Sequence, residues 1–333
     1  MVCSHAIHRK GDEEQVGHLG EGRRQGYDTS GCFWNNTHIE NTIYYTLFSF
    51  WMITTIILFG QTGMLGNYIY TFFKTTKYNV KCINERITET NIHSVEEWLV
   101  ANGIDNTTCI INCIGQIPQR SQDARKFVLI NSVFPNILWS ICKKHNAQMI
   151  QPTTDCVFSG KKQGGKYTEN DIHDETGLYG ISKSLGEPPE CTILRTSIIG
   201  REKYNKTSFM EWVLNSTCEI DGWNNHYWNG ITCLEYCHIV RKILDENLFW
   251  KGVKHIYSPN TMSKYEMIEC IKEAFGITIG TRRVSVSDTI DKTLMSIYEP
   301  MFPIQSLEKQ IKDLASFHIL YTYEDLNPHK NAK

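Results

Sequence analysis

The feature that most constrains this chain is a run of apolar residues that ends in a glycine-rich turn. Residues 56–59 are Ile-Ile-Leu-Phe, and glycines follow at positions 60, 63 and 66. This pattern is typical of a buried strand that turns sharply into a helix, whose N-terminal N–H groups attract anions. We expect Gly60 to let the backbone turn, Gly63 to leave room for a pyrophosphate, and Gly66 to let helix and strand pack closely. Because the spacing is G-x-x-G-x-x-G, the segment also fits a turn in another kind of α/β protein.

Strand-like and helix-like segments alternate after this turn. Helices are expected over residues 67–75, from Ser94, and over 124–145, the last as one helix or as two that meet at Pro135. Buried strands are expected over residues 79–83, 109–115 and 148–151. This alternation predicts an α/β fold with a parallel, doubly wound sheet.

The end of the second expected strand carries two charged residues with different preferences. Glu85 and Arg86 lie some 25 residues beyond Gly60, where a dinucleotide-binding fold places the group that meets the adenine ribose. Glu85 could accept a hydrogen bond from a 2′-hydroxyl, whereas Arg86 could pair with a 2′-phosphate. Both NAD(H) and NADP(H) therefore stay open, with a slight preference for NADP(H), and a solvated strand end without a ligand is the alternative.

Composition limits the class of protein. The 333 residues carry a formal net charge of −2, which gives no electrostatic reason to expect a nucleic acid or a membrane surface as partner. The 12 cysteines are scattered singly and often lie in apolar runs, as buried thiols do in a reducing, cytoplasmic compartment. Their spacing matches no metal site, so no bound metal is expected.

Residues 1–51 are expected to form a disordered extension outside the fold. They have mixed charges, scattered histidines and no periodicity. The apolar run over 43–59 resembles a membrane span, but its second half is the strand that the glycine turn requires. The remainder is too short to cross a bilayer, so the folded part is expected to begin at Met52.

Three side chains further along have the chemistry of carbonyl reduction. Tyr179 and Lys183 are four residues apart and so lie on one face of a helix. An ammonium group near a phenol stabilises the phenolate and lowers the pKa of the phenol, which can then exchange a proton with a substrate oxygen. The hydroxyl of Thr154 could add a hydrogen bond to the same oxygen. A tyrosine and a lysine at this spacing also occur by chance on helix surfaces, but their order after the glycine turn favours a site.

With these motifs the chain resembles the extended short-chain dehydrogenase/reductase superfamily, and within it the dTDP-4-dehydrorhamnose reductase group. The resemblance covers roughly residues 53–275 and rests on the segments 60–66, 112–115, 153–160, 179–187 and 194–200. It implies a Rossmann-type NAD(P)-binding domain over 52–200 and a smaller, interleaved substrate-binding lobe over 201–325. It also implies a nucleoside-diphosphate 4-keto-6-deoxy sugar as substrate, in deoxysugar and polysaccharide biosynthesis.

The resemblance assigns roles to individual residues. Tyr179 is the proton donor, Lys183 binds the nicotinamide ribose and tunes the tyrosine, and Thr154 is the supporting hydroxyl. The cofactor-binding residues it implies are Gly60, Thr62, Gly63, Met64, Leu65, Gly66, Arg86, Gly115 and Lys183. The substrate-binding residues are Asp155, Phe158, Arg195, Trp228 and Asn229.

Two departures from the group bear on these assignments. Cys156 stands where the reductases usually carry an aromatic residue and the related 4,6-dehydratases a glutamate. Because a thiol cannot replace that glutamate, dehydration is not expected. Pro188 and Pro189 end the helix of Tyr179 early, whereas many relatives dimerise through a longer helix, so both a monomer and a homodimer remain open.

The second half of the chain is less readable. Residues 204–230 are rich in Trp, Asn and Tyr, which could stack on a base and hydrogen-bond to a sugar, or simply pack in a small domain. Helices are expected over 233–246 and 263–275 and a short strand over 255–258, with no clear pattern beyond 280. A sugar-nucleotide epimerase of the same fold and a non-catalytic nucleotide-binding regulatory subunit are the alternative functions.

Overall fold

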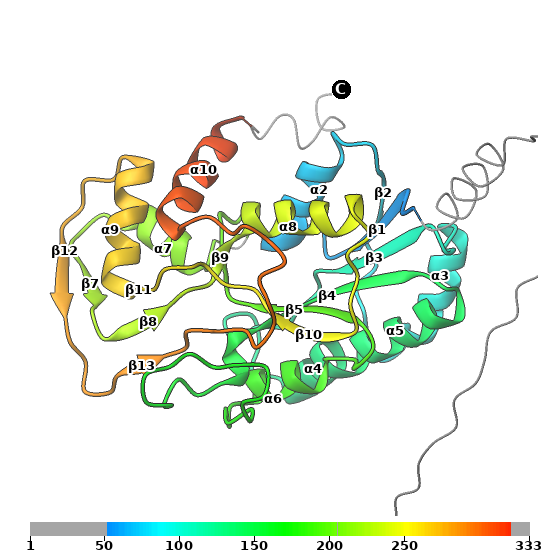
Figure 1. Cartoon of the computed structure of the whole chain (residues 1–333), viewed down its shortest axis with the longest axis horizontal. Coiled ribbons are helices and arrows are strands. Elements are labelled where there is room, and N and C mark those ends of the chain that lie inside the picture. The colour runs from blue at the N-terminus through cyan, green and yellow to red at the C-terminus, as the bar shows by residue number, and fades with distance from the viewer. Residues whose placement is uncertain (1–51, 205, 321–333) are drawn as a thin grey trace, which may run out of the picture. The chain divides into compact units, whose positions relative to one another are not determined.

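The computed structural model describes residues 52–204 and 206–320 (Figure 1). The predicted extension over 1–51 and the end of the predicted lobe beyond 320 lie outside the described residues. The helices are α2 (Met64–Phe73), α3 (Val95–Ala101), α4 (Ala124–Phe127), α5 (Phe134–Lys144), α6 (Leu178–Leu185), α7 (Phe209–Asn215), α8 (Cys233–Asp245), α9 (Lys264–Phe275) and α10 (Leu307–Leu320), with 3₁₀ turns η2 (Ile92–Ser94) and η4 (Asp155–Val157) and a π-helical turn η3 (Val128–Val133). The strands are β1 (Thr55–Phe59), β2 (Asn79–Ile83), β3 (Thr108–Asn112), β4 (Gln148–Thr154), β5 (Thr192–Thr196), β6 (Ile198–Ile199), β7 (Ile220–Trp223), β8 (His226–Trp228), β9 (Ile231–Thr232), β10 (Gly252–His255), β11 (Met262–Ser263), β12 (Thr281–Val284) and β13 (Ile290–Asp291).

A six-stranded parallel sheet lies at the centre, with the strand order β10-β5-β4-β3-β1-β2. The predicted parallel, doubly wound sheet is therefore confirmed. After β1 the chain adds β2 on one side and then returns to add β3 on the other, so the winding reverses between β1 and β3. Open parallel sheets bind ligands at such a reversal, beyond the carboxyl ends of the strands.

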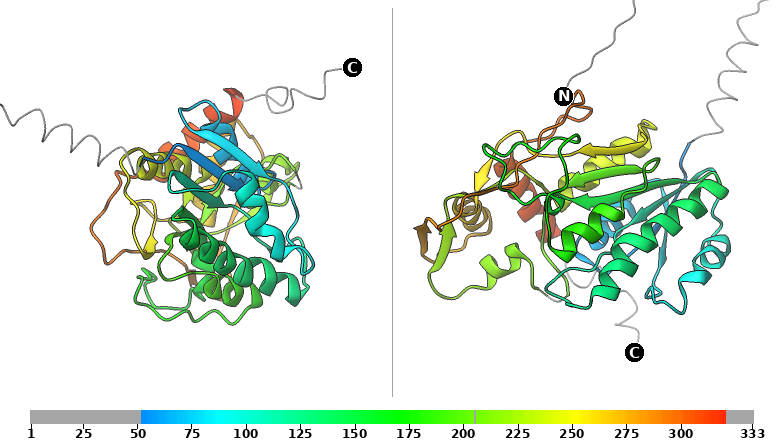
Figure 2. Two further views of the ribbon diagram at one scale, coloured as in Figure 1. Left: turned by 90° about the vertical axis from the view of Figure 1, so that its right-hand side faces the viewer. Right: turned by 90° about the horizontal axis from the view of Figure 1, so that it is seen from below.

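Alternate side chains of β1 enter two different cores, one on each face of the sheet. Ile56 and Leu58 pack with α2, α8 and α10, whereas Ile57 and Phe59 pack with α3 and α5. Figure 1 shows α2 and α8 on one side of the strands and α4 and α5 on the other, and Figure 2 shows the same layers from two further directions. This two-sided burial explains why β1 is apolar throughout rather than alternating.

The helical run over 124–144 is continuous, and its irregularity lies before Pro135. Residues 128–133 form the π-helical turn η3, and Pro135 lies in the first turn of α5. Proline has no N–H group, so the carbonyl of Asn131 lacks its usual partner four residues on. That carbonyl instead lies against Gly186, where an added Cβ would come within 1.7 Å of it.

The C-terminal segments differ from the prediction in two places. The strand expected over 255–258 is wrong, because β10 ends at His255; β10 pairs with β5 and so completes the main sheet. The helix α10 was not predicted, although Leu307, Ile311 and Leu314 recur at helical spacing and are fully buried. The other strands form small sheets, β11-β8-β13, β12-β7 and β6-β9.

Two observations concern the described part of the chain as a whole. None of its helices is long and apolar enough to cross a membrane. Its ten cysteines, at positions 82, 109, 113, 142, 156, 191, 218, 233, 237 and 270, are all free thiols.

Candidate active site

The glycine turn after β1 has the geometry that its sequence predicts. Gly60 has φ +78°, and a Cβ there would lie 2.8 Å from the carbonyl carbon of Cys113. A Cβ at Gly66 would lie 2.0 Å from the Gly60 carbonyl oxygen. A side chain at either position would therefore collide with backbone, so β1, β3 and α2 meet through their main chains.

The N-terminus of α2 has the features of a diphosphate site. Gly63 is the N-cap residue, no side chain caps the helix, and its first turn holds no acidic residue. The N–H groups of that turn, which includes Met64 and Leu65, thus have no side-chain acceptor, and the positive end of the helix dipole favours an anion there. The residues present fit the diphosphate of a dinucleotide. Thr62 is exposed beside the turn, whereas the side chain of Leu65 is buried.

The end of β2 is tied to the same turn. The Gln61 side-chain amide donates a hydrogen bond to Asn84 Oδ1. Glu85 and Arg86 follow and are exposed, and neither forms an ion pair within residues 52–204 and 206–320. Either side chain is thus available to a ribose or a phosphate. The positions of Glu85 and Arg86 therefore leave both NAD(H) and NADP(H) open, as the sequence did.

Thr154 and Tyr179 meet at the carboxyl end of β4. Thr154 is the last residue of the strand, and its side chain lies close enough to the Tyr179 phenol to influence the pKa of that phenol. Its Oγ1 also accepts from the Cys156 N–H at 3.1 Å. The backbone of α6 packs closely here, since a Cβ at Gly180 would lie 2.3 Å from the Cys156 carbonyl oxygen. The strand end and the helix therefore bring the predicted hydroxyl and phenol together.

The electrostatics of Tyr179 differ from the prediction. Burial raises the pKa of the phenol, with Cys156 acting in the same direction and the neighbouring Thr154 hydroxyl opposing. The predicted lowering of this pKa by Lys183 is not what the structure shows, because the Lys183 Nζ donates to the Pro152 carbonyl oxygen at 3.3 Å. Tyr179 is consequently protonated at neutral pH, as a proton donor must be.

Lys183 links this pair to the glycine turn. Burial lowers its pKa, and the nearby Glu187 and Cys113 oppose that shift, so the ammonium group lies near Cys113. The Cys113 N–H donates to the Phe59 carbonyl oxygen at 3.0 Å, and its own carbonyl lies against Gly60. The helix that carries Tyr179 and Lys183 therefore stands beside the mouth of the turn.

A residue that the sequence did not single out, Asn131, holds this helix in place. Its Nδ2 donates to the Gln116 carbonyl oxygen at 2.9 Å and to Ser182 Oγ at 3.0 Å, and its Oδ1 accepts from the Gln116 N–H at 2.8 Å. Gly115 is adjacent, and a Cβ there would lie 3.9 Å from Asn131 Oδ1. The sequence signal that could have indicated this role is an asparagine in an apolar helix, four residues before a proline.

Arg195, predicted to contact substrate, is instead the centre of a buried cluster. Only 2% of its surface is exposed. Its guanidinium donates to both carboxylate oxygens of Glu187 at 3.1 and 2.6 Å, to His173 Nε2 at 2.8 Å and to His255 Nε2 at 3.0 Å. With these donors engaged, the structure does not support direct contact between Arg195 and a substrate. Its role is to join β5 to β10 and to the segments that precede and follow α6.

The two histidines of this cluster are neutral, since each accepts a hydrogen bond from Arg195. Burial lowers the pKa of His255 to about 4, and the guanidinium charge acts in the same direction. The Nδ1–H of His255 donates to the Met295 carbonyl oxygen at 2.8 Å. Burial likewise lowers the pKa of His173.

Three further predicted substrate residues are enclosed in the same way. Phe158 is fully buried and stacks on Tyr167 with ring centroids 4.3 Å apart. The Asn229 side chain donates to the Leu294 carbonyl oxygen and accepts from its N–H, both at 2.8 Å. Trp228 is 4% exposed. These side chains are buried, and the polar groups of Asn229 are engaged, so their predicted substrate contact is not supported either.

Asp155 alone of the predicted substrate residues lies beside the Thr154–Tyr179 pair. It is 3% exposed and accepts a hydrogen bond from the Thr154 hydroxyl at 3.2 Å. It can orient that hydroxyl without itself leaving the interior.

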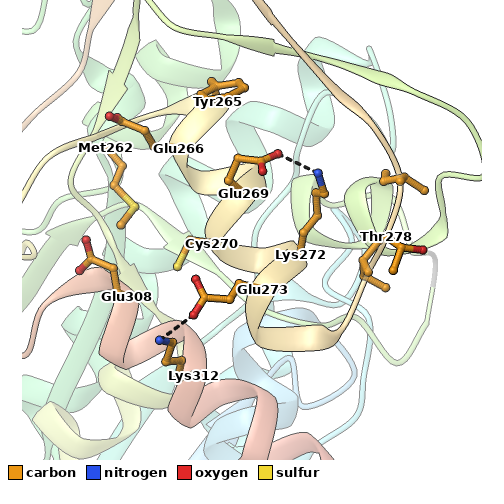
Figure 3. A pocket seen from close by; sticks show the side chains of 12 residues that line it. Met262, Tyr265, Glu266, Glu269, Cys270, Lys272, Glu273, Thr278, Glu308 and Lys312 are labelled. Carbon is orange, nitrogen blue, oxygen red and sulfur yellow. Dashed lines mark hydrogen bonds and ion pairs between the residues drawn. The ribbon is translucent and has the colours of Figure 1, made fainter.

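A separate hollow of about 590 Å³ lies between α9 and α10 (Figure 3). Its carboxylates are engaged: Glu269 pairs with Lys272 at 2.8 Å and Glu273 with Lys312 at 2.9 Å, while Glu308 accepts from Asn260 and Glu266 belongs to the capping box of α9. Across the described ranges, no cluster of three or more His, Cys, Asp or Glu side chains could hold a metal ion. Neither finding adds a second chemical centre.

The fold and these residues define a member of the extended short-chain dehydrogenase/reductase superfamily. The profile of the RmlD substrate binding domain matches residues 54–292, and the chain belongs to that family. It is 23% identical over 255 residues to the spore coat polysaccharide biosynthesis protein SpsK of Bacillus subtilis, an alignment that spans 74% of this chain and 88% of SpsK.

Two further proteins are similar over most of their length. The structure of dTDP-4-dehydrorhamnose reductase from Bacillus anthracis in complex with NADP superposes with a TM-score of 0.68 at 18% identity, covering 80% of this chain and 100% of the other. Methionine adenosyltransferase 2 subunit beta of Danio rerio is 23% identical over 254 residues, which span 67% of this chain and 74% of that protein.

Proposed function

We propose that the protein reduces the keto group of a nucleoside-diphosphate 4-keto-6-deoxy sugar with NAD(P)H, in deoxysugar and polysaccharide biosynthesis. The observation that carries the proposal is that Thr154 and Tyr179 lie together where α6 packs on the end of β4, with Lys183 beside the glycine turn. Family membership and the names of SpsK and the B. anthracis reductase support the same class of reaction.

The residues have separate tasks in this reaction. When bound, the nicotinamide supplies a hydride to the carbonyl carbon. Tyr179 donates its proton to the carbonyl oxygen, and the Thr154 hydroxyl, on turning from Asp155 to the substrate, adds a hydrogen bond that fixes the position of that oxygen. Lys183, one helical turn on and anchored to the Pro152 carbonyl oxygen, would bind the nicotinamide ribose beside the glycine turn.

The cofactor is proposed to lie along the turn with its diphosphate at Gly63 and its adenosine towards Glu85 and Arg86. The B. anthracis structure contains NADP, which supports the slight preference for NADP(H). A homodimer and a monomer both remain compatible with this site.

The test is to incubate the protein with NADPH and a panel of dTDP-, UDP- and GDP-linked 4-keto-6-deoxy sugars, and to follow oxidation of NADPH. Stoichiometric oxidation with one member of the panel is the expected result. An epimerase would interconvert sugars without net oxidation. A regulatory subunit, as the name of the D. rerio relative suggests for that protein, would bind NADPH and turn over none of the sugars.

A further inference from the structure

The loop between β3 and α4 is linked to a distant part of the chain by an ion pair. In the part of the chain that the structure describes, the hydrogen bonds of residues 117–122 stay within the loop or reach the residues that adjoin it. The exception to this local pattern is the Arg120 side chain, whose Nη2 lies 3.5 Å from Glu202 Oε1. Glu202 lies between β6 and α7, so the pair joins two segments that are far apart in the sequence.

The Glu202 end of this ion pair is held in place by other contacts. Its side chain is 5% exposed, and Oε2 accepts from the N–H groups of Thr207 and Ser208 at 2.6 and 2.9 Å. The Glu202 N–H donates to Glu211 Oε1 at 2.9 Å. Because these bonds do not involve Arg120, Glu202 is a fixed acceptor to which the loop can attach.

The Arg120 end is loosely held. Its side chain is 34% exposed, and most of the neighbouring loop residues are exposed as well. Only the two ends of the loop are anchored, since Gln116 forms two hydrogen bonds with the Asn131 side chain and Asp123 is the N-cap residue of α4. A partly exposed ion pair is weak enough to break and form again repeatedly, so the loop can swing about its anchored ends.

The two segments that the ion pair joins also contact the glycine turn and α2. The loop begins at Cys113, whose carbonyl carbon would lie 2.8 Å from a Cβ at Gly60. On the other side, the Arg201 N–H donates to the phenol oxygen of Tyr68 in α2 at 3.2 Å, and the residue after Arg201 is the acceptor of the ion pair. The contacts therefore form a closed ring that includes the N-terminus of α2, and the ion pair is the link in this ring that can open.

We propose that the ion pair of Arg120 and Glu202 is a clasp that holds the β3–α4 loop closed over a cofactor at the glycine turn. The clasp then sets the rate at which the cofactor is exchanged. The identity of the cofactor rests on the proposed function. The winding of the sheet reverses between β1 and β3, where an open parallel sheet binds its ligand, and the loop borders this place because it begins where β3 ends.

The experiment is stopped-flow measurement of NADPH binding and release by the full chain, followed through the fluorescence of the reduced nicotinamide. Arg120→Met and Glu202→Gln each remove the ion pair, and the glutamine can still accept from the two N–H groups before α7. Since the clasp joins two protein groups, it hinders entry and release alike. Both variants should therefore raise the association and dissociation rate constants about two- to fivefold and leave the Kd nearly unchanged.

Two further variants sharpen the measurement. The double variant should exchange NADPH as fast as each single variant does, because the ion pair can be lost only once. Lys143→Met is the matched control. The ion pair of Lys143 with Glu190 has a similar length of 3.6 Å, but it lies where α5 leads back to the start of β4, at the opposite edge of the sheet from the glycine turn. This variant should exchange NADPH at the wild-type rate.

Wild-type exchange rates in Arg120→Met or Glu202→Gln would overturn the proposal, as would a wild type that binds no NADPH. Opposite effects would also overturn it. If Arg120 were itself a ligand of the cofactor, Arg120→Met would raise the Kd, whereas Glu202→Gln would free the guanidinium and slow NADPH release. Faster exchange in both variants of a protein that reduces no sugar would support the clasp and contradict the proposed reduction. Sugar reduction with unaltered exchange would do the reverse.

Discussion

The carboxyl ends of β1 and β5 are built in opposite ways. At β1 the chain offers backbone N–H groups at the start of α2 with no side-chain acceptor, and glycines keep other groups away. At β5 it places the strongest hydrogen-bond donor of the region, Arg195, and surrounds it with Glu187, His173 and His255. A ligand site leaves its donors open, whereas a structural cluster pairs every one of them. The two regions should therefore respond differently to mutation, the first in binding and the second in stability.

The largest effect on stability is expected for Arg195→Met. The substitution leaves the Glu187 carboxylate, whose side chain is 7% exposed, without its partner, and a buried charge left alone costs about 3–5 kcal/mol. The free energy of unfolding in urea measures this loss. Arg282→Met is the matched control, because its pair with Asp221 is 63% and 44% exposed and should contribute about 0–1 kcal/mol. Equal losses in the two variants would contradict a structural role for Arg195.

The same cluster should make stability fall in mild acid. The pKa of His255 is about 4 in the folded chain against 6.5 ordinarily, so between these values the unfolded chain binds more protons and stability drops as the pH falls. From pH 7 to pH 4 the contribution of this residue is about 2–3 kcal/mol. His255→Gln can keep the hydrogen bond from Arg195 without titrating, and its urea midpoint should depend less on pH. A pH dependence identical to that of the wild type would exclude His255 as the source.

The turn after β1 should respond in binding alone. A Cβ at Gly63 would lie 3.3 Å from the Gly60 carbonyl oxygen, a distance that a small shift relieves, but the methyl group would fill space intended for a phosphate. Gly63→Ala is expected to weaken NADPH binding about 10–100-fold, equivalent to about 1.4–2.7 kcal/mol, with stability nearly unchanged. Gly280→Ala meets the Glu219 side chain at 3.2 Å and should not alter NADPH affinity. Unchanged NADPH affinity in Gly63→Ala would remove the diphosphate from this turn.

The smallest effect concerns the choice of cofactor at the end of β2. If Arg86 meets a 2′-phosphate, Arg86→Gln should raise the KM for NADPH about tenfold and leave that for NADH unchanged. If Glu85 meets a 2′-hydroxyl, Glu85→Gln should raise the KM for NADH instead. The variant that changes neither KM identifies the residue that is merely solvated.

The comparison also shows what the sequence can and cannot predict here. The glycine turn was predictable because its signal is local: three glycines and one apolar strand within eleven residues fix the backbone, and no distant partner is required. Thr154, Tyr179 and Lys183 were found by their order along the chain. The structural role of Arg195 could not be predicted in this way, because its partners come from three separate segments of the chain that only the folded protein brings together.

The remaining differences have similar causes. The pKa of Tyr179 depends on how far the surrounding residues bury the phenol and on which acceptor the Lys183 Nζ bonds. The spacing of four residues between Tyr179 and Lys183 predicts neither. Asn131 acts through a π-helical turn, which has no simple sequence pattern. The helix α10, in contrast, did carry a readable apolar period, and that signal was missed.

The most direct test of the account is the rate of NADPH oxidation by Tyr179→Phe with the nucleotide sugar that the wild type reduces. Removal of the phenol proton should lower kcat about 10²–10⁴-fold, while NADPH affinity measured by calorimetry stays at the wild-type value. Wild-type turnover in this variant would contradict the assignment of Tyr179 as proton donor and with it the proposed reduction.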